Sequence, residues 1–168
     1  MIALWDRYER RLIGVLGAFA LIIGTYQIAG RYISPEFAAP WANELGVYVV
    51  VWAVFIAASN LVATDSHVRP DLVLRVLSPR ARRVVEIGNS LCALAFCVGL
   101  VWYGAFIVAD ALEFDERSLS PLAFPMSIYY AALPLGTLLM SVRYVLRLYR
   151  LLFHFSVQDA AALPLSHE

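Results

Sequence analysis

Long stretches without charged residues alternate with short segments that carry almost all of the charge. The stretches are continuous and show no strand-like alternation of apolar and polar residues, so they predict helices. A helix rises about 1.5 Å per residue, and about 20 apolar residues cross the roughly 30 Å core of a bilayer. The pattern predicts an all-α integral membrane protein of four transmembrane helices in a single membrane domain, residues 1–168. The predicted spans are residues 12–30, 45–64, 87–109 and 126–147.

Proline marks the start of three of these helices. Ser78 followed by Pro79 is typical of a helix N-cap and first helical position, which places the start of the third helix near Pro79, well before its uncharged run. Pro40 similarly opens the second helix, and Pro125 precedes the fourth. The third helix is therefore expected to tilt or to protrude beyond the membrane.

The connection between the second and third spans has an amphipathic pattern. Val68, Leu72 and Val76 fall on one helical stripe, with Asp71 and Arg75 four residues apart on the other side. This predicts a short amphipathic helix at the inner membrane interface. The alternative is a loop with some buried leucines.

The basic residues are unevenly distributed among the connections. The 13 basic residues are all arginine and balance 13 acidic residues, so the net charge gives no indication of a nucleic-acid partner. Ten arginines lie in the N-terminal segment, the second connection and the C-terminal end, against two, Arg31 and Arg117, in the first and third connections. Short basic loops stay in the cytoplasm. Both termini are therefore predicted to be cytoplasmic.

Composition and residue spacing argue against an enzyme. The chain is 61% hydrophobic and 15% charged, which excludes most soluble enzymes. Cys92 and Cys97 lie on different sides of one predicted helix and cannot easily pair. All three histidines, including His67, lie outside the predicted spans, which argues against a membrane haem. Nothing in the spacing indicates a catalytic site, a cofactor or a metal.

Two features of the spans indicate close helix packing, either within the chain or against a partner. Small residues recur at a spacing of four, which permits close helix contact. The pairs are Gly14 and Ala18, Ala20 and Gly24, Ala95 and Gly99, and Ala132 and Gly136. One face of the second helix carries Glu44, Tyr48, Trp52, Phe55 and Ser59. This face is either part of the chain's own core or a ridge for a partner.

Several motifs, in this order along the chain, are similar to those of one transporter family. They are Arg31-Tyr32, Trp41 with Glu44, Trp52 with Phe55, His67-Val68-Arg69-Pro70-Asp71, Leu77-Ser78-Pro79 with Arg82, and Pro134 with Gly136 and Arg143. Two positions depart from the family pattern: Asn43 replaces a second acid, and Pro70 stands within the most specific motif. The chain resembles the small membrane subunit of tripartite ATP-independent periplasmic (TRAP) transporters, the DctQ-like family.

The resemblance implies a non-catalytic subunit of a heteromeric complex. A large permease subunit would carry the substrate, usually an organic acid, together with sodium, and a periplasmic binding protein would deliver it. The implied structural or partner-interface residues are Arg31, Trp41, Glu44, Trp52, Phe55, His67, Arg69, Asp71 and Arg143. Membrane lipid would cover the remaining apolar surface.

Two further expectations complete the prediction. Glu44 lies so close to the apolar zone that it should meet a cation, either Arg31 or a basic group of the large subunit; the alternative is that Glu44 and Arg31 merely mark where water begins. Two alternative classes remain: the small subunit of a tripartite tricarboxylate transporter, whose members lack the motif from His67 to Asp71, and a self-assembling four-helix channel or exporter. The substrate and the number of copies in the complex stay open.

Overall fold

The computed structural model describes residues 2–33, 40–63, 78–120 and 123–153. It contains four helices in this part of the chain. They are α1 (Ile2–Ile33), α2 (Pro40–Ala63), α4 (Pro79–Glu113) and α5 (Met126–Phe153). Each is long and apolar enough to cross a membrane. The prediction of an all-α fold with four spans is confirmed, and each helix extends beyond its predicted span at one end or both.

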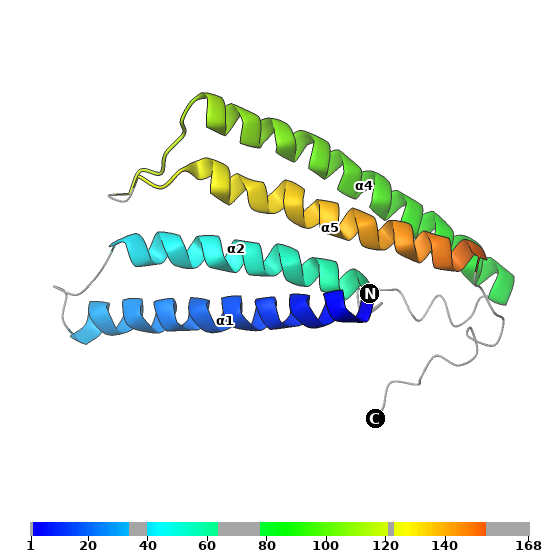
Figure 1. The fold of residues 1–168 in the computed structure, drawn as a ribbon, viewed down its shortest axis with the longest axis horizontal. Coiled ribbons are helices and arrows are strands. Elements are labelled where there is room, and N and C mark those ends of the chain that lie inside the picture. The colour runs from blue at the N-terminus through cyan, green and yellow to red at the C-terminus, as the bar shows by residue number, and fades with distance from the viewer. Residues whose placement is uncertain (1, 34–39, 64–77, 121–122, 154–168) are drawn as a thin grey trace.

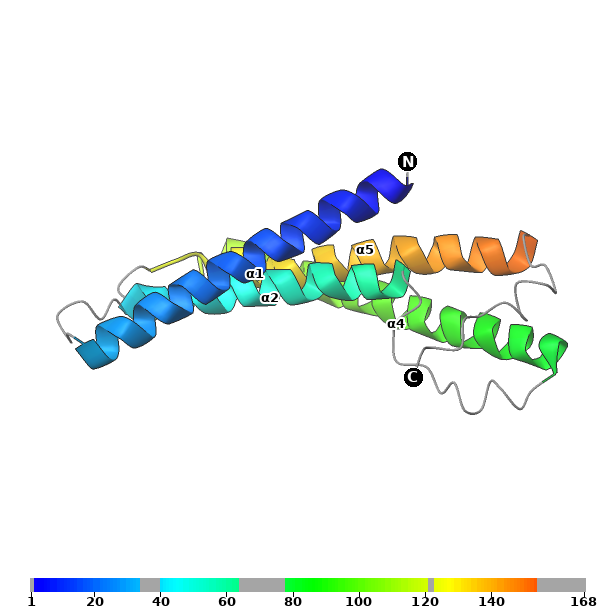
Figure 2. The ribbon, with the colours of Figure 1, turned by 90° about the horizontal axis from the view of Figure 1, so that it is seen from below.

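The four helices form a single layer and not a closed bundle. Extensive contacts join α4 to α5, α5 to α2, and α2 to α1, so the order across the layer is α4–α5–α2–α1 (Figure 1). Seen from the edge, α1 crosses α2 obliquely (Figure 2). In the most apolar stretch of α1 only 6% of the residues are buried, against 44% of the residues in the corresponding stretch of α5. The core therefore follows α5, and α1 and α4 are the two edges of the layer.

The helix starts agree with the sequence signals. Ser78 adopts an extended conformation at φ −60° and ψ 153°, and its hydroxyl accepts a bond from the amide of Ala81 at 3.4 Å. Pro79 is the first residue of α4, and Pro40 the first residue of α2. Pro125 immediately precedes α5. The 35 residues of α4 correspond to about 52 Å, longer than a hydrocarbon core is thick, so α4 tilts or protrudes as expected.

Glycine allows α5 to approach both of its neighbours closely. A Cβ added at Gly136 of α5 would lie 2.5 Å from the Cβ of Phe55 on α2. A Cβ added at Gly104 of α4 would lie 3.1 Å from the ring of Pro134 on α5. Ala132, one turn before Gly136, is fully buried. Of the predicted small-residue pairs, Ala132 with Gly136 thus forms a close helix contact, whereas Gly14, Gly24 and Gly99 face open space.

A short connection, residues 114–125, joins α4 to α5, and we call the end of the layer where it lies the loop end. It folds back on itself through an isolated β-bridge between Arg117 and Pro125. The amide of Ser118 donates to the carbonyl of Phe124, and the amide of Met126 donates to the carbonyl of Glu116, both at 2.9 Å. These bonds hold the serine side chains of the connection beside the start of α2.

Part of the sequence prediction falls outside the described residues. The proposed amphipathic helix of the second connection lies there, and so do His67, Arg69 and Asp71. These remain predictions.

Candidate functional site

The aromatic face of α2 packs against α5 of the same chain. The hydroxyl of Tyr48 approaches the sulfur of Met126 at 3.3 Å, and the indole N–H of Trp52 donates to the carbonyl of Ile128 at 3.2 Å. Phe55 lies against Gly136. Trp52 and Phe55 are thus half-buried against α5 and contribute to the chain's own packing, whereas a contact of their exposed part with a partner remains a prediction.

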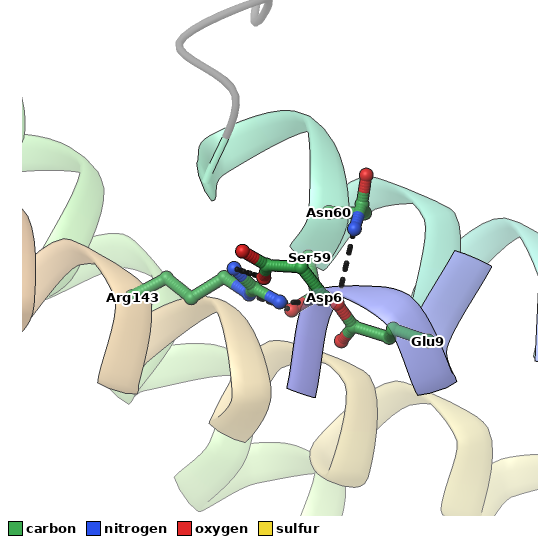
Figure 3. Close-up of polar contacts among 5 residues, drawn as sticks. All are labelled: Asp6, Glu9, Ser59, Asn60 and Arg143. Carbon is green, nitrogen blue, oxygen red and sulfur yellow. Dashed lines mark hydrogen bonds and ion pairs between the residues drawn. The ribbon is translucent and has the colours of Figure 1, made fainter. Parts of the chain in front are cut away.

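A buried ion-pair network joins three helices at the opposite end of the layer, which we call the Arg143 end (Figure 3). Arg143 of α5 is only 6% exposed. Its Nη1 donates to Asp6 at 2.9 Å, its Nη2 donates to Oε2 of Glu9, and its Nε donates to the hydroxyl of Ser59 at 3.0 Å. Asp6 and Glu9 belong to α1, and Ser59 to α2, so one guanidinium holds α1, α2 and α5 together.

Two further side chains complete the network. The amide of Asn60 donates to Oε2 of Glu9 at 3.3 Å. The ring of Trp5 lies 5.4 Å from the guanidinium carbon of Arg143, within the range of a cation–π contact. A charge at this depth is costly unless it is paired and hydrogen-bonded. The planar arginine fork suits this position because it serves several acceptors at once.

The network contains more negative than positive charge. One arginine faces two carboxylates, and Glu9 is as buried as its partner, at 5% exposure. Oε2 of Glu9 accepts from both Arg143 and Asn60. Oε1 of Glu9 is buried without a hydrogen-bond donor among the residues that the structure describes.

Asp6 and Glu9 were missed by the sequence analysis. It identified Arg143 as a candidate but treated the N-terminal charges as a cytoplasmic flank. The available signal was an acidic pair three residues apart, which lies on one helix face, together with an arginine inside the fourth apolar stretch. The sequence could not show that these residues pair with Arg143, because their meeting depends on how α1 crosses α2.

Glu44 has hydroxyl partners at the loop end. The hydroxyl of Tyr48 donates to its Oε1 at 2.9 Å, and the hydroxyl of Ser120 donates to its Oε2. Ser120 in turn lies 3.0 Å from the hydroxyl of Ser118. Glu44 thereby ties α2 to the connection between α4 and α5. The expected pair with Arg31 does not form in the described part of the chain, where Arg31 is exposed at the end of α1.

An open groove lies beside Glu44. It measures about 580 Å³ and is lined mostly by apolar and aromatic side chains, among them Tyr48, Met126, Tyr129 and Tyr130. At its rim, Arg117 donates to both carboxylate oxygens of Asp115 at 3.1 Å. These bonds and the negative charge of Asp115 raise the pKa of Arg117.

The remaining candidates play simpler roles. Trp41 stacks on Tyr26 of α1, with ring centroids 6.4 Å apart, and so joins the first two helices at the loop end. Cys92 is exposed and Cys97 buried, and neither is in a disulfide. Within the described ranges, no three His, Cys, Asp or Glu side chains gather closely enough to hold a metal ion.

The fold and its buried network define a small multi-pass membrane protein whose helices are joined by buried ion pairs and hydrogen bonds. The family of "Tripartite ATP-independent periplasmic transporters, DctQ component" matches residues 20–154. The chain therefore belongs to the DctQ family, as the motifs suggested, and is an inner-membrane protein. The tricarboxylate-transporter alternative is thereby set aside.

Three curated relatives support the same family. The isethionate TRAP transporter permease protein DctMQ of Oleidesulfovibrio alaskensis is 27% identical over 135 residues, which cover 77% of this chain and 21% of the relative. The C4-dicarboxylate TRAP transporter small permease protein DctQ of Rhodobacter capsulatus is 33% identical over 107 residues, covering 62% and 46%. The ectoine TRAP transporter small permease protein TeaB of Halomonas elongata is 25% identical over 134 residues, covering 78% and 68%. The chain spans less than two thirds of the first two relatives.

Proposed function

We propose that this chain is the small, non-catalytic membrane subunit of a TRAP transporter and braces a large permease subunit. The observation that carries the proposal is the single layer of four helices in a member of the DctQ family. A layer offers two broad faces to its surroundings, whereas a closed bundle hides most of its interior. One face suits a large membrane partner, and lipid suits the rest.

The longest relative points to the identity of that partner. The permease protein DctMQ is matched over only 21% of its length, so most of it has no counterpart in this chain. We infer that the remainder corresponds to a large permease, which here would be a separate polypeptide.

The polar residues inside the spans support a bracing role. Ser59, Arg143 and Glu9 bond to one another between helices, and Thr137 and Ser141 bond to carbonyls of their own helix at 2.7 and 2.8 Å. An anionic substrate in the membrane needs donors and positive charge. In the described helices the guanidinium of Arg143 is engaged in joining α1, α2 and α5, and the hydroxyls of Thr137 and Ser141 are engaged within α5. Substrate and sodium would accordingly be handled by the large subunit.

The direction of the chain and the remaining partners belong to the same proposal. The excess of arginine in the N-terminal segment and the second connection favours a cytoplasmic Arg143 end, with both termini inside. The loop end would then face the periplasm, where a substrate-binding protein docks. The relatives' names include isethionate, C4-dicarboxylate and ectoine, each of which bears an acid group, so an organic acid is the proposed substrate class.

Copurification and reconstitution test this function. An affinity-tagged chain extracted from its native membranes should bring down a large permease, and the pair in liposomes should take up a radiolabelled organic acid when binding protein and a sodium gradient are supplied. Omitting this chain should abolish uptake, and replacing sodium by potassium is the control. Uptake by the purified chain alone would instead support the self-assembling channel or exporter.

A further inference from the structure

A second groove lies where the N-terminal half of α1 crosses α2, on the side of the layer that carries the Arg143 network. It measures about 550 Å³ and is lined almost entirely by apolar atoms. Its walls include Trp5, Leu12 and Val15 of α1, Ile56 of α2, Leu139 of α5, and the carboxylate-bearing Glu9. We call it the α1 groove. From Trp5 to Val15 it follows about three turns of α1, which is enough to receive a neighbouring helix.

Glu9 gives the α1 groove a chemical requirement. Burying a polar atom without a hydrogen bond is unfavourable, and such atoms in native structures usually have a partner. Oε1 of Glu9 has none in the described part of the chain. The carboxylates of Asp6 and Glu9 face a single guanidinium, that of Arg143, so the three side chains together have one negative charge in excess. Arg11 also lines the groove, but its side chain is exposed and does not bond to Oε1 of Glu9.

The position of α1 indicates what kind of molecule meets this requirement. It is an edge helix that packs extensively only against α2, and its exposed side chains include Val15, at 65%, and Leu12, at 48%. A lipid tail would fill an apolar groove but offers no donor for Glu9. A protein helix offers both an apolar surface and a donor side chain.

We propose that the α1 groove is the docking site for a transmembrane helix of the large permease subunit, which places a basic side chain next to Glu9. This side chain would supply the missing donor and balance the charge of the network. The inference rests on the proposed function, because it requires a large membrane partner. It goes further by assigning the face and the charge that recognise this partner.

Groove-filling and charge-removing variants test the site in the whole complex. Val15→Trp fills the groove without altering the ion pairs, and Glu9→Gln removes the charge that recognises the partner. Each should lower the amount of large permease that copurifies with the tagged chain by about tenfold, which corresponds to about 1.4 kcal/mol. Leu91→Trp, at a residue of α4 that is 58% exposed, is the matched control and should leave copurification unchanged.

Cross-linking separates the possible occupants. In a Cys92→Ser background, Val15→Cys should cross-link to the large permease, whereas Leu91→Cys should not. A cross-linked dimer of this chain, or normal copurification with loss of bound phospholipid in Val15→Trp, would overturn the proposal in favour of a second copy or a lipid. Normal copurification of both groove variants would also overturn it. If the unmodified chain brings down no large permease, the proposed function itself fails.

Discussion

Phe55 of α2 lies directly against Gly136 of α5, so close that a Cβ added to the glycine would be 2.5 Å from the Cβ of Phe55. We predict that Gly136→Ala destabilises the protein by about 1–3 kcal/mol, the usual cost of overpacking. A thermal melt of the purified protein in detergent measures the change. Gly99→Ala is the control, since nothing lies within 4 Å of a Cβ added there. Equal melting temperatures for the two variants would show that this seam is not closely packed.

Replacement of Arg143 should be more damaging than replacement of any exposed arginine. Arg143→Met leaves Asp6 and Glu9 buried without a counter-charge, at a cost of about 3–5 kcal/mol. Arg143→Lys should recover little of this stability, because one ammonium group cannot donate in the directions of Asp6, Glu9 and Ser59 as the planar guanidinium does. Arg10→Met, at an exposed position, is the control.

The same network allows a rescue experiment. Combining Arg143→Met with Asp6→Asn and Glu9→Gln removes all three charges at once. Because no uncompensated charge then remains, the triple variant should melt above Arg143→Met. A triple variant that is less stable than Arg143→Met would mean that the carboxylates stabilise the fold by some means other than pairing with the arginine.

Glu44 and Ser120 should be energetically coupled, and Glu44 and Arg31 should not. Glu44 accepts a hydrogen bond from Ser120 and ties α2 to the connection before α5. We propose a double-mutant cycle on the free energy of unfolding. Glu44→Ala with Ser120→Ala should show a coupling energy of about 0.5–3 kcal/mol, whereas the effects of Glu44→Ala and Arg31→Ala should be additive. Additivity in the first cycle would contradict the hydrogen bond. If the first cycle is coupled and the second additive, charge reversal at Glu44 then tests a contact with the large subunit.

Arg69 and Asp71 remain candidates from the sequence alone. We predict that they hold the second connection against the inner membrane face or the large subunit. Asp71→Ala and Arg69→Ala should each reduce transport or the recovery of the complex. Unchanged uptake and assembly in both variants would remove these residues from the list of functional candidates.

The sequence predicted the elements that depend on local signals. The four uncharged stretches gave the spans, and Ser78 with Pro79 gave the start of α4, because span length and helix capping are encoded by neighbouring residues. α1 begins at Ile2, before the predicted span of residues 12–30, because a helix can continue beyond the membrane core whereas the uncharged stretch marks only the part inside it. The first turns of α1 carry Asp6 and Glu9, whose pairing with Arg143 of α5 is a contact between helices that no local signal reveals.

Other features could not be predicted because they depend on which helices are neighbours. Trp52 and Phe55 share a face in the sequence, but only the position of α5 shows that this face packs against α5. Glu44 was expected to need a cation, whereas the fold of the connection brings Ser120 to it. Tyr48 is four positions away on the same helix, but Ser120 is 76 positions away, a distance over which a single sequence carries no pairing signal.

The Arg143 network also determines where the layer can bend. A row of helices that touch only their nearest neighbours can fold at each seam, as hinged panels do. Arg143 links α1 to α5 across α2. As a result, neither the α1–α2 seam nor the α2–α5 seam can open without breaking an ion pair. The edge helix α4 packs extensively only against α5, along a seam that includes Gly104 and Pro134. The Arg143 network therefore covers three of the four helices, and α4 is held instead by its own long seam with α5, at whose far end Arg83 donates to the carbonyls of Leu151 and Leu152.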